Sequence, residues 1–171
     1  MAIDAIGDVV RPFDGDRSPA SIDAARRLSA SLIGVVRVLE QTREQFADSI
    51  GVTTTEVRAL GRIAEFGPIT PKELATRLML TTGTITPLLD SLVCAGLVER
   101  EPNPADRRSV HIRLTDLGHH EMSGVYGDLH ARVLRAIAAK SDDEAQKLAS
   151  CLDDVIVVLG EFTGLPPAKK P

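Results

Sequence analysis

Two segments of this 171-residue sequence carry side chains whose types and spacing could do chemistry. Residues 81–86 read Thr-Thr-Gly-Thr-Ile-Thr, and residues 107–113 hold three arginines and no acidic residue. A threonine hydroxyl can hydrogen bond to a phosphate or a base edge, and its methyl group can contact a thymine methyl. An arginine guanidinium suits a narrow, electronegative minor groove. Together the two segments point to contacts with double-stranded DNA.

Three capping boxes, in which a Ser or Thr N-cap is followed three residues later by Glu, mark helix starts around these segments. They begin at Thr53, Thr70 and Ser141. We therefore expect a short helix after Thr70 and a second one over about 82–95, joined by a turn at 79–83. The second helix carries an apolar stripe that we expect to be buried: Ile85, Leu88, Leu89, Leu92 and Val93.

A β-hairpin is predicted after Gly96, the natural C-terminal cap of that helix. Leu97–Arg100 is typical of a short strand, and Val110–Leu114 alternates apolar and polar residues as a half-buried strand does. Two short helices and a hairpin describe a winged helix-turn-helix, whose second helix enters the major groove while the hairpin forms a wing. From this pattern alone, a winged-helix module used for protein contacts stays open.

The first and last predicted helices carry long apolar seams outside this unit. One helix follows the start signal Ser18–Pro19, and the other follows the capping box at Ser141. The mostly apolar seam residues alternate at spacings of three and four: Ala25, Leu28, Leu32, Val35, Leu39, Thr42 and Phe46, and then Ala145, Leu148, Leu152, Val155, Leu159 and Phe162. Such a seam suits either packing on the chain's own core or a subunit interface.

Four segments resemble the MarR family of bacterial regulators, namely residues 81–92, 95–100, 103–109 and 114–118. The most specific piece is an Asp and Arg pair ahead of the Leu-Thr-x-x-Gly start of a helix. The resemblance is strong over about 53–118 and follows the helix order over 20–162. It implies DNA-binding transcriptional regulation, and we expect a repressor that a small molecule releases from DNA.

The resemblance implies a mainly α (α+β) fold, with about six helices, one β-hairpin wing and dimerisation helices at both ends. It also implies an obligate homodimer on a palindromic operator, with recognition helices about 34–36 Å apart. The expected interface residues are Ala25, Leu28, Leu32, Val35, Leu148, Leu152, Val155 and Leu159. The expected organisation is a flexible arm over 1–17, a dimerisation helix over 18–50, the winged helix over 53–115, dimerisation helices over 116–162 and a disordered tail over 163–171. Within the winged helix, the recognition helix is expected at about 82–95 and the wing at about 97–114.

The expected DNA contacts lie on both short helices and on the wing: Thr70, Lys72, Thr81, Thr82, Gly83, Thr84, Thr86, Pro87, Arg100, Asp106, Arg107, Arg108, Ser109 and His111. By family position, Arg108 enters the minor groove, Asp106 orients it and Arg107 contacts a phosphate. Many relatives carry basic residues where this chain has Pro87 and Ser91, which predicts fewer phosphate contacts and a shallower salt dependence. Pro87 also predicts an irregular start to the recognition helix.

Charge and composition exclude several classes of protein. A formal charge of -4 rules out a uniformly basic, histone-like binder, although a local basic patch is compatible with it. Residues 67–114 hold six basic and five acidic residues, a net +1, which leaves -5 for the remainder. Aromatic residues make up 3%, too few for a single-strand binder that stacks bases. The apolar run Val155–Leu159 is far shorter than the roughly 20 residues of a membrane span, so we expect no membrane partner and a cytoplasmic protein.

We expect no enzymatic activity, no cofactor and no metal site. The sequence has no phosphate loop, GxSxG or HExxH motif, and the adjacent His119 and His120 point about 100° apart on a helix. Cys94 and Cys151 are expected to be packing residues. The sequence resembles the peroxide-sensing branch of the family, which needs a reactive cysteine in the N-terminal helix. This chain has no cysteine before residue 94, so the resemblance does not imply peroxide sensing here. A metal- or redox-gated version of the same regulator is the alternative.

The expected effector is a small lipophilic or phenolic molecule. The resemblance implies a crevice between the dimer helices and the DNA-binding lobe, lined here by Leu32, Val36, Leu60, Ile63, Met122 and Tyr126. These are also ordinary core residues. Ligand binding would shift the population from DNA-competent to splayed dimers.

Overall fold

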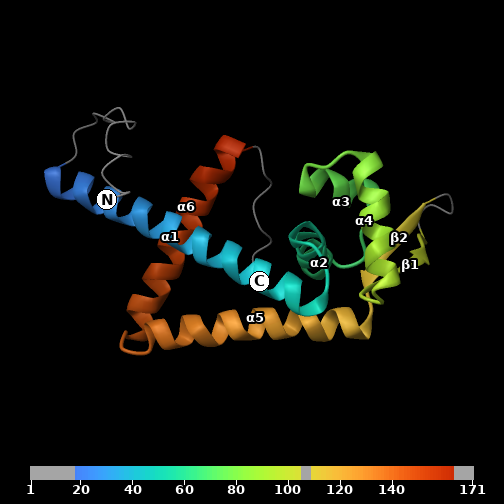
Figure 1. Cartoon of the computed structure of the whole chain (residues 1–171). Coiled ribbons are helices and arrows are strands. Elements are labelled where there is room, and N and C mark those ends of the chain that lie inside the picture. The colour runs from blue at the N-terminus through green and yellow to red at the C-terminus, as the bar shows by residue number, and fades with distance from the viewer. Residues whose placement is uncertain (1–17, 105–108, 164–171) are drawn as a thin grey trace. The chain divides into compact units, whose positions relative to one another are not determined.

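The computed structural model describes residues 18–104 and 109–163, which form six helices and one β-hairpin (Figure 1). In chain order these are α1 (Pro19–Ile50), α2 (Thr54–Phe66), α3 (Pro71–Leu78), α4 (Thr82–Cys94), β1 (Val98–Pro102), β2 (Val110–Leu114), α5 (Asp116–Ile137) and α6 (Asp142–Thr163). This order confirms the predicted fold class. The chain divides into two compact units, one ending at Ile50 and the other beginning at Gly51. None of the described helices combines the length and apolar character needed to span a bilayer.

The three predicted capping boxes are all present. The Thr53 hydroxyl accepts from the Glu56 N–H at 3.2 Å, and the Glu56 carboxylate accepts from the Thr53 N–H at 2.7 Å. The same reciprocal pair joins Thr70 with Glu73, and Ser141 with Glu144. Each box satisfies backbone N–H groups that have no partner inside the helix, so it sets where the helix begins.

The first unit is the long helix α1, which begins after Ser18 as predicted and ends where Gly51 adopts a φ of +70°. Its seam is largely open to solvent: Leu28 is 39% exposed and Val35 is 54% exposed. Within α1, Ala47 alone is classed as buried. An apolar face left open in the single chain does not fit a helix that packs only on its own core.

The core of the second unit lies where α2, α3 and α4 meet the hairpin. Its most deeply buried side chains are Leu60, Ile63, Leu74, Ile85, Leu89, Leu92, Val98 and Ile112. The strands pair antiparallel, with Val98 opposite Leu114 and Pro102 opposite Val110. Ile69, just before α3, exchanges two backbone hydrogen bonds with Ile112 and so ties the helices to the hairpin.

The predicted burial of Val93 and Cys94 is wrong, because both are exposed. The buried face of α4 is complete at Leu92, and successive helical residues turn by about 100° away from it. Cys151 is also exposed in the single chain, so its expected packing at a subunit interface stays a prediction.

Gly96 ends α4 as predicted, in a left-handed conformation with a φ of +70°. The Leu97 N–H donates to the Leu92 carbonyl and the Gly96 N–H to the Val93 carbonyl, both at 3.0 Å, which is the Schellman pattern. Leu97 is therefore part of the helix cap, and the strand begins one residue later than predicted, at Val98.

The start of α5 is joined directly to this cap by what we call the Thr115–Gly118 junction. The Thr115 hydroxyl donates to the Gly96 carbonyl at 2.6 Å and accepts from the Gly118 N–H at 3.0 Å. The Thr115 N–H donates to the Leu97 carbonyl at 3.1 Å. A Cβ at Gly118 would overlap the Leu97 carbonyl oxygen, so only glycine permits this approach. The Leu-Thr-x-x-Gly motif thus has a structural reason.

We expect Gly118→Ala to lower the free energy of unfolding by at least about 2 kcal/mol, because the added methyl group would push α5 off the end of α4. Gly124→Ala is the matched control on the same helix, since a Cβ there meets nothing within 4 Å. It should be neutral or stabilise by up to about 1 kcal/mol. Denaturant titrations followed by circular dichroism compare the two, and equal stabilities would contradict the role of Gly118.

Candidate nucleic-acid interface

The exposed side of α4 gathers the threonines that the sequence singled out. Its buried residues are Ile85, Leu88, Leu89 and Leu92. Its exposed residues include Thr81, Thr82, Gly83, Thr84, Thr86 and Pro87. All six predicted contact residues of this helix therefore lie on its solvent side, where a major groove could receive them.

Thr81 and Thr84 set the first turn of α4. The Thr81 hydroxyl accepts from the Thr84 N–H at 3.3 Å and lies 2.9 Å from the Thr84 hydroxyl. The helix is continuous through Pro87, so the predicted irregular start is wrong. Proline removes only the hydrogen bond that the Gly83 carbonyl would accept, and Gly83 is exposed, so water can replace that donor.

The turn before α4 begins at Met79, which caps α3 in a left-handed conformation with a φ of 56°. Its N–H donates to the Ala75 and Thr76 carbonyls, and its side chain is 71% exposed. Ahead of α3, the Thr70 hydroxyl is held in the capping box with Glu73, and Lys72 is exposed. The predicted contacts Thr70 and Lys72 thus lie at the N-terminal end of α3.

A buried glutamate fixes α4 against α2, a feature that sequence reasoning missed. The sequence predicts only a capping role for Glu56, yet the residue is 6% exposed and also accepts a hydrogen bond from Ser91 of α4. Burial raises the pKa of Glu56, but the hydrogen bonds from Ser91 and Thr53 outweigh it and hold the pKa below its usual value. Ser91 therefore helps to hold α4 against α2.

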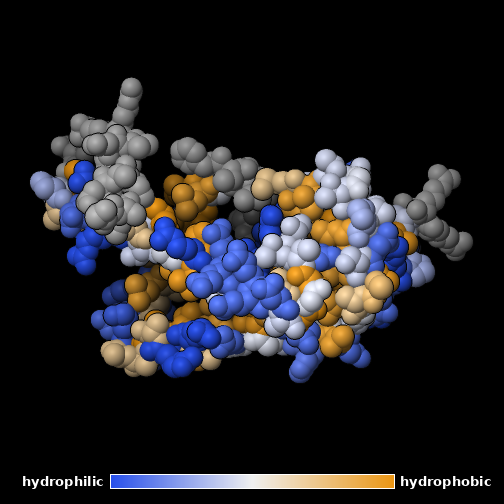
Figure 2. Space-filling view, in the orientation of Figure 1, coloured by the Kyte–Doolittle hydropathy of each residue, from blue (hydrophilic) through white to orange (hydrophobic). Residues whose placement is uncertain are grey.

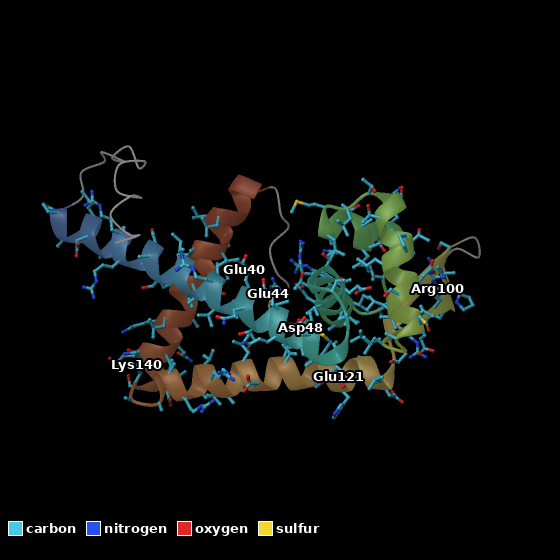
Figure 3. The ribbon with its side chains drawn as sticks, viewed as in Figure 1. Glu40, Glu44, Asp48, Arg100, Glu121 and Lys140 are labelled. Atoms are coloured by element: carbon cyan, nitrogen blue, oxygen red, sulfur yellow. The ribbon has the colours of Figure 1, made fainter. Side chains whose placement is uncertain are left out.

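The hairpin divides its charged residues between two sides. Arg100 of β1, which is labelled in Figure 3, reaches α4. Its Nη2 lies 2.7 Å from Oδ1 of Asp90. Arg113 of β2 lies 2.8 Å from the Glu99 carboxylate and 3.1 Å from that of Glu101. The wing arginine Arg113 is therefore neutralised by its own hairpin.

The base of the wing loop is closed by Asn103 and Ser109. The Asn103 side-chain amide donates to the Ser109 hydroxyl at 2.7 Å, and its backbone N–H donates to the Ser109 carbonyl at 3.2 Å. Half-buried His111 lies close enough to Glu73 for its charge to help lower that carboxyl's pKa, after the larger effect of the hydrogen bonds from Thr70. The predicted contacts Asp106, Arg107 and Arg108 lie outside the described residues.

A cavity of about 560 Å³ opens on the second unit between α2, β2 and α5. It is lined by Arg62, Ala64, Glu65, Leu114, His119, Met122, Ser123 and Tyr126. Two of the predicted effector residues, Met122 and Tyr126, are among them. Leu60 and Ile63 belong to the core instead, at 0% and 2% exposure, because they form the side of α2 that packs inward.

The polar part of this cavity is an ion pair on α2. Arg62 Nη1 lies 2.6 Å from Glu65 Oε2, and His119 of α5 lines the same cavity. Gly61 gives Tyr126 room, since a Cβ there would lie 3.3 Å from the tyrosine hydroxyl. Leu32 and Val36 belong to α1, in the first unit. Over residues 18–104 and 109–163, no group of three His, Cys, Asp or Glu side chains could hold a metal ion.

This arrangement of two short helices, an exposed helix face and a closed hairpin defines a winged helix-turn-helix protein. The family model described as MarR family matches residues 52–110. The multiple antibiotic resistance protein MarR of Escherichia coli is 34% identical over 118 residues, which cover 66% of this chain and 78% of that protein. The chain therefore belongs to the MarR family of transcriptional regulators, with a DNA-binding winged helix.

The chain is also similar to another regulator and to two solved structures. The HTH-type transcriptional regulator YkoM of Bacillus subtilis is 35% identical over 99 residues, 57% of this chain and 64% of that protein. The crystal structure of RV1404 from Mycobacterium tuberculosis has a TM-score of 0.64 at 26% identity, covering 84% of this chain and 96% of that one. The apo structure of MarR itself has a TM-score of 0.53 at 30% identity, covering 74% and 96%. Members of this family are DNA-binding proteins and not enzymes, as the sequence predicted.

We expect Glu56→Gln to lower the free energy of unfolding at pH 7 by about 1–2 kcal/mol, since an ionised acceptor of several hydrogen bonds is lost. Because the pKa of Glu56 is lower in the folded state, the carboxylate stabilises the fold above its ordinary pKa of 4.5. That contribution disappears as pH falls through the folded value. The difference between wild type and variant should therefore shrink below about pH 4.5.

Ser91→Ala is the matched variant, because it removes one of these hydrogen bonds and leaves the capping box intact. Its loss of stability should be smaller than that of Glu56→Gln and should also fade in acid. Urea unfolding between pH 3 and pH 7 measures both, and a difference independent of pH would exclude this account.

Proposed function

We propose that this protein is a homodimeric repressor that binds a palindromic operator and is released by a small-molecule ligand. The observation that carries the proposal is the exposed face of α4, which presents four threonines and Gly83 beside a closed hairpin. Hydroxyl and methyl groups on one helix face are suited to reading base edges in the major groove. A regulator of this kind acts where the chromosome is, so we assign it to the cytoplasm.

The DNA contacts that we propose are those expected from the sequence. Thr81, Thr82 and Thr86, with their neighbours on α4, would face the major groove. Arg108 would enter the minor groove from the wing, with Asp106 orienting it. The remaining contacts would position the protein on the DNA backbone, and they are Thr70, Lys72, Arg107, Ser109 and His111. Arg100, the other contact expected from the sequence, is paired with Asp90 and so would not bind a phosphate in this state.

The dimer is supported by apolar surface that the single chain leaves open. Leu148 and Leu152 of α6 are each 45% exposed and Leu159 is 56% exposed, and Figure 2 shows hydrophobic surface over α6. Leu28 and Val35 of α1 are exposed as well. Self-association buries such seams, and a twofold axis would place the two α4 helices on successive half-sites of a palindrome.

The ligand site is supported by the cavity between α2 and α5. Met122 and Tyr126 give it apolar and aromatic surface, while Arg62 and His119 offer polar partners to a phenol or a small anion. Since α2 also packs against α3, a ligand that moves α5 relative to α2 would bias the position of the DNA-binding helices.

We expect Arg108→Ala to weaken DNA binding by about 1–3 kcal/mol, roughly 5- to 150-fold, through loss of the minor-groove contact. Fluorescence anisotropy would use a duplex covering the region upstream of the protein's own gene, at 50 and 200 mM salt. Arg132→Ala is the control, because it removes an equal charge from a pair with Asp128 on α5.

Three outcomes are informative. Salt-sensitive binding that only Arg108→Ala weakens supports the wing contact. If neither substitution changes binding, the threonines of α4 and not the wing determine the specificity for DNA. Absence of binding to both upstream and random duplex by a folded dimer contradicts the proposal.

We expect Leu152→Asp to convert the dimer into a monomer, because it places a charge in the apolar seam of α6. Ser150→Asp adds the same charge about 200° around the helix and should leave the dimer intact. Sedimentation velocity at micromolar concentration separates the two states, and circular dichroism shows whether each variant folds. A folded Leu152→Asp variant that remains dimeric would contradict this interface.

A further inference from the structure

The DNA-facing helix carries no cation. The sequence of α4 from Thr82 to Cys94 holds one charged side chain, Asp90, and that charge is negative. Asp90 follows Thr82 and Thr86 at intervals of four residues, so it continues their exposed face, and its side chain is 58% exposed. A bare carboxylate at this place would repel the phosphates of any duplex that α4 approaches.

The structure cancels this charge with a residue from outside the helix. Arg100 of β1 is 40% exposed and forms an ion pair with Asp90, its Nη2 lying 2.7 Å from Oδ1. The next residues on either side of Arg100, Glu99 and Glu101, turn to the other side of the strand and pair with Arg113. Both arginines that the described strands contribute are therefore paired with carboxylates.

An exposed ion pair of this kind contributes little to stability, so holding the hairpin against α4 is a poor reason for it. The pair matters more for DNA binding than for stability, because non-specific DNA binding comes almost wholly from cations that neutralise phosphates. A guanidinium that is already paired with a carboxylate adds little to that attraction.

We propose that Asp90 is a specificity-determining residue, which pairs with Arg100 to keep the recognition surface electrically neutral. The pair reduces the affinity for random duplex, so that binding depends on base contacts made by the threonines of α4. This proposal rests on the DNA-binding function of the family and on α4 being the recognition helix.

The test is Asp90→Asn, which keeps the side-chain shape and frees Arg100. For random-sequence duplex, the slope of log K against log salt should steepen by about 0.9, the value of one added phosphate contact. Between 200 and 50 mM salt the variant should therefore gain about 3.5-fold more affinity than wild type does. Its preference for the upstream duplex over random duplex should fall.

Asp128→Asn is the matched control. It also breaks an exposed pair between aspartate and arginine, with Asp128 Oδ2 2.6 Å from Nε of Arg132, but on α5. It removes the same net charge from the protein, so it reports the effect of overall charge alone. Its salt slope should be that of wild type.

A second variant separates this role from a merely structural one. Arg100→Gln leaves the Asp90 carboxylate unpaired and should weaken binding to both duplexes, and adding Asp90→Asn should restore part of the loss. If the pair only held the hairpin in place, both single variants would weaken binding and neither would change the salt slope.

A wild-type slope for Asp90→Asn, or the same change for Asp128→Asn, would overturn the proposal while leaving DNA binding itself established. A folded wild-type protein that binds no duplex at any salt concentration would contradict the proposed function as well as this inference. Anisotropy titrations over 50–200 mM salt distinguish these results.

Discussion

The close approach of α5 to the end of α4 is the constraint on which the DNA-binding unit depends. Gly118 lies against the Leu97 carbonyl, and the Thr115 hydroxyl closes both the cap of α4 and the first turn of α5. Since β1 begins directly after the cap of α4 and β2 ends directly before Thr115, the same few backbone groups also fix the base of the wing. A small backbone junction thus couples the recognition helix, the hairpin and the long helix that leads to α6.

In the described part of the hairpin, the arginines Arg100 and Arg113 are paired with carboxylates and do not form a basic patch. A chain with a formal charge of -4 has no general attraction for DNA. If the threonines of α4 face DNA as proposed, their hydroxyl and methyl groups would supply contacts that do not depend on net charge.

Sequence patterns predicted local structure well at helix caps and turns, where the residue type directly determines the local backbone geometry. All three capping boxes and the Gly96 cap were placed at the right residue and the strand ends to within two residues, because each depends on backbone geometry near in sequence. Predictions of burial failed at the end of α4. Val93 and Cys94 continue an apolar run, but the direction that each faces depends on what packs against the helix.

The sequence by itself determined the family, the order of elements and the residues at the helix ends, since these follow from local hydrogen bonding and from motifs. Only the tertiary structure decided which polar groups meet. Glu56 with Ser91, Asp90 with Arg100, and Arg113 with two glutamates join different helices and strands, and neither spacing nor composition predicted these pairings. A local sequence pattern predicts the hydrogen bonds between a side chain and the nearby backbone. The partner of a side chain in another helix or strand depends on how these elements pack.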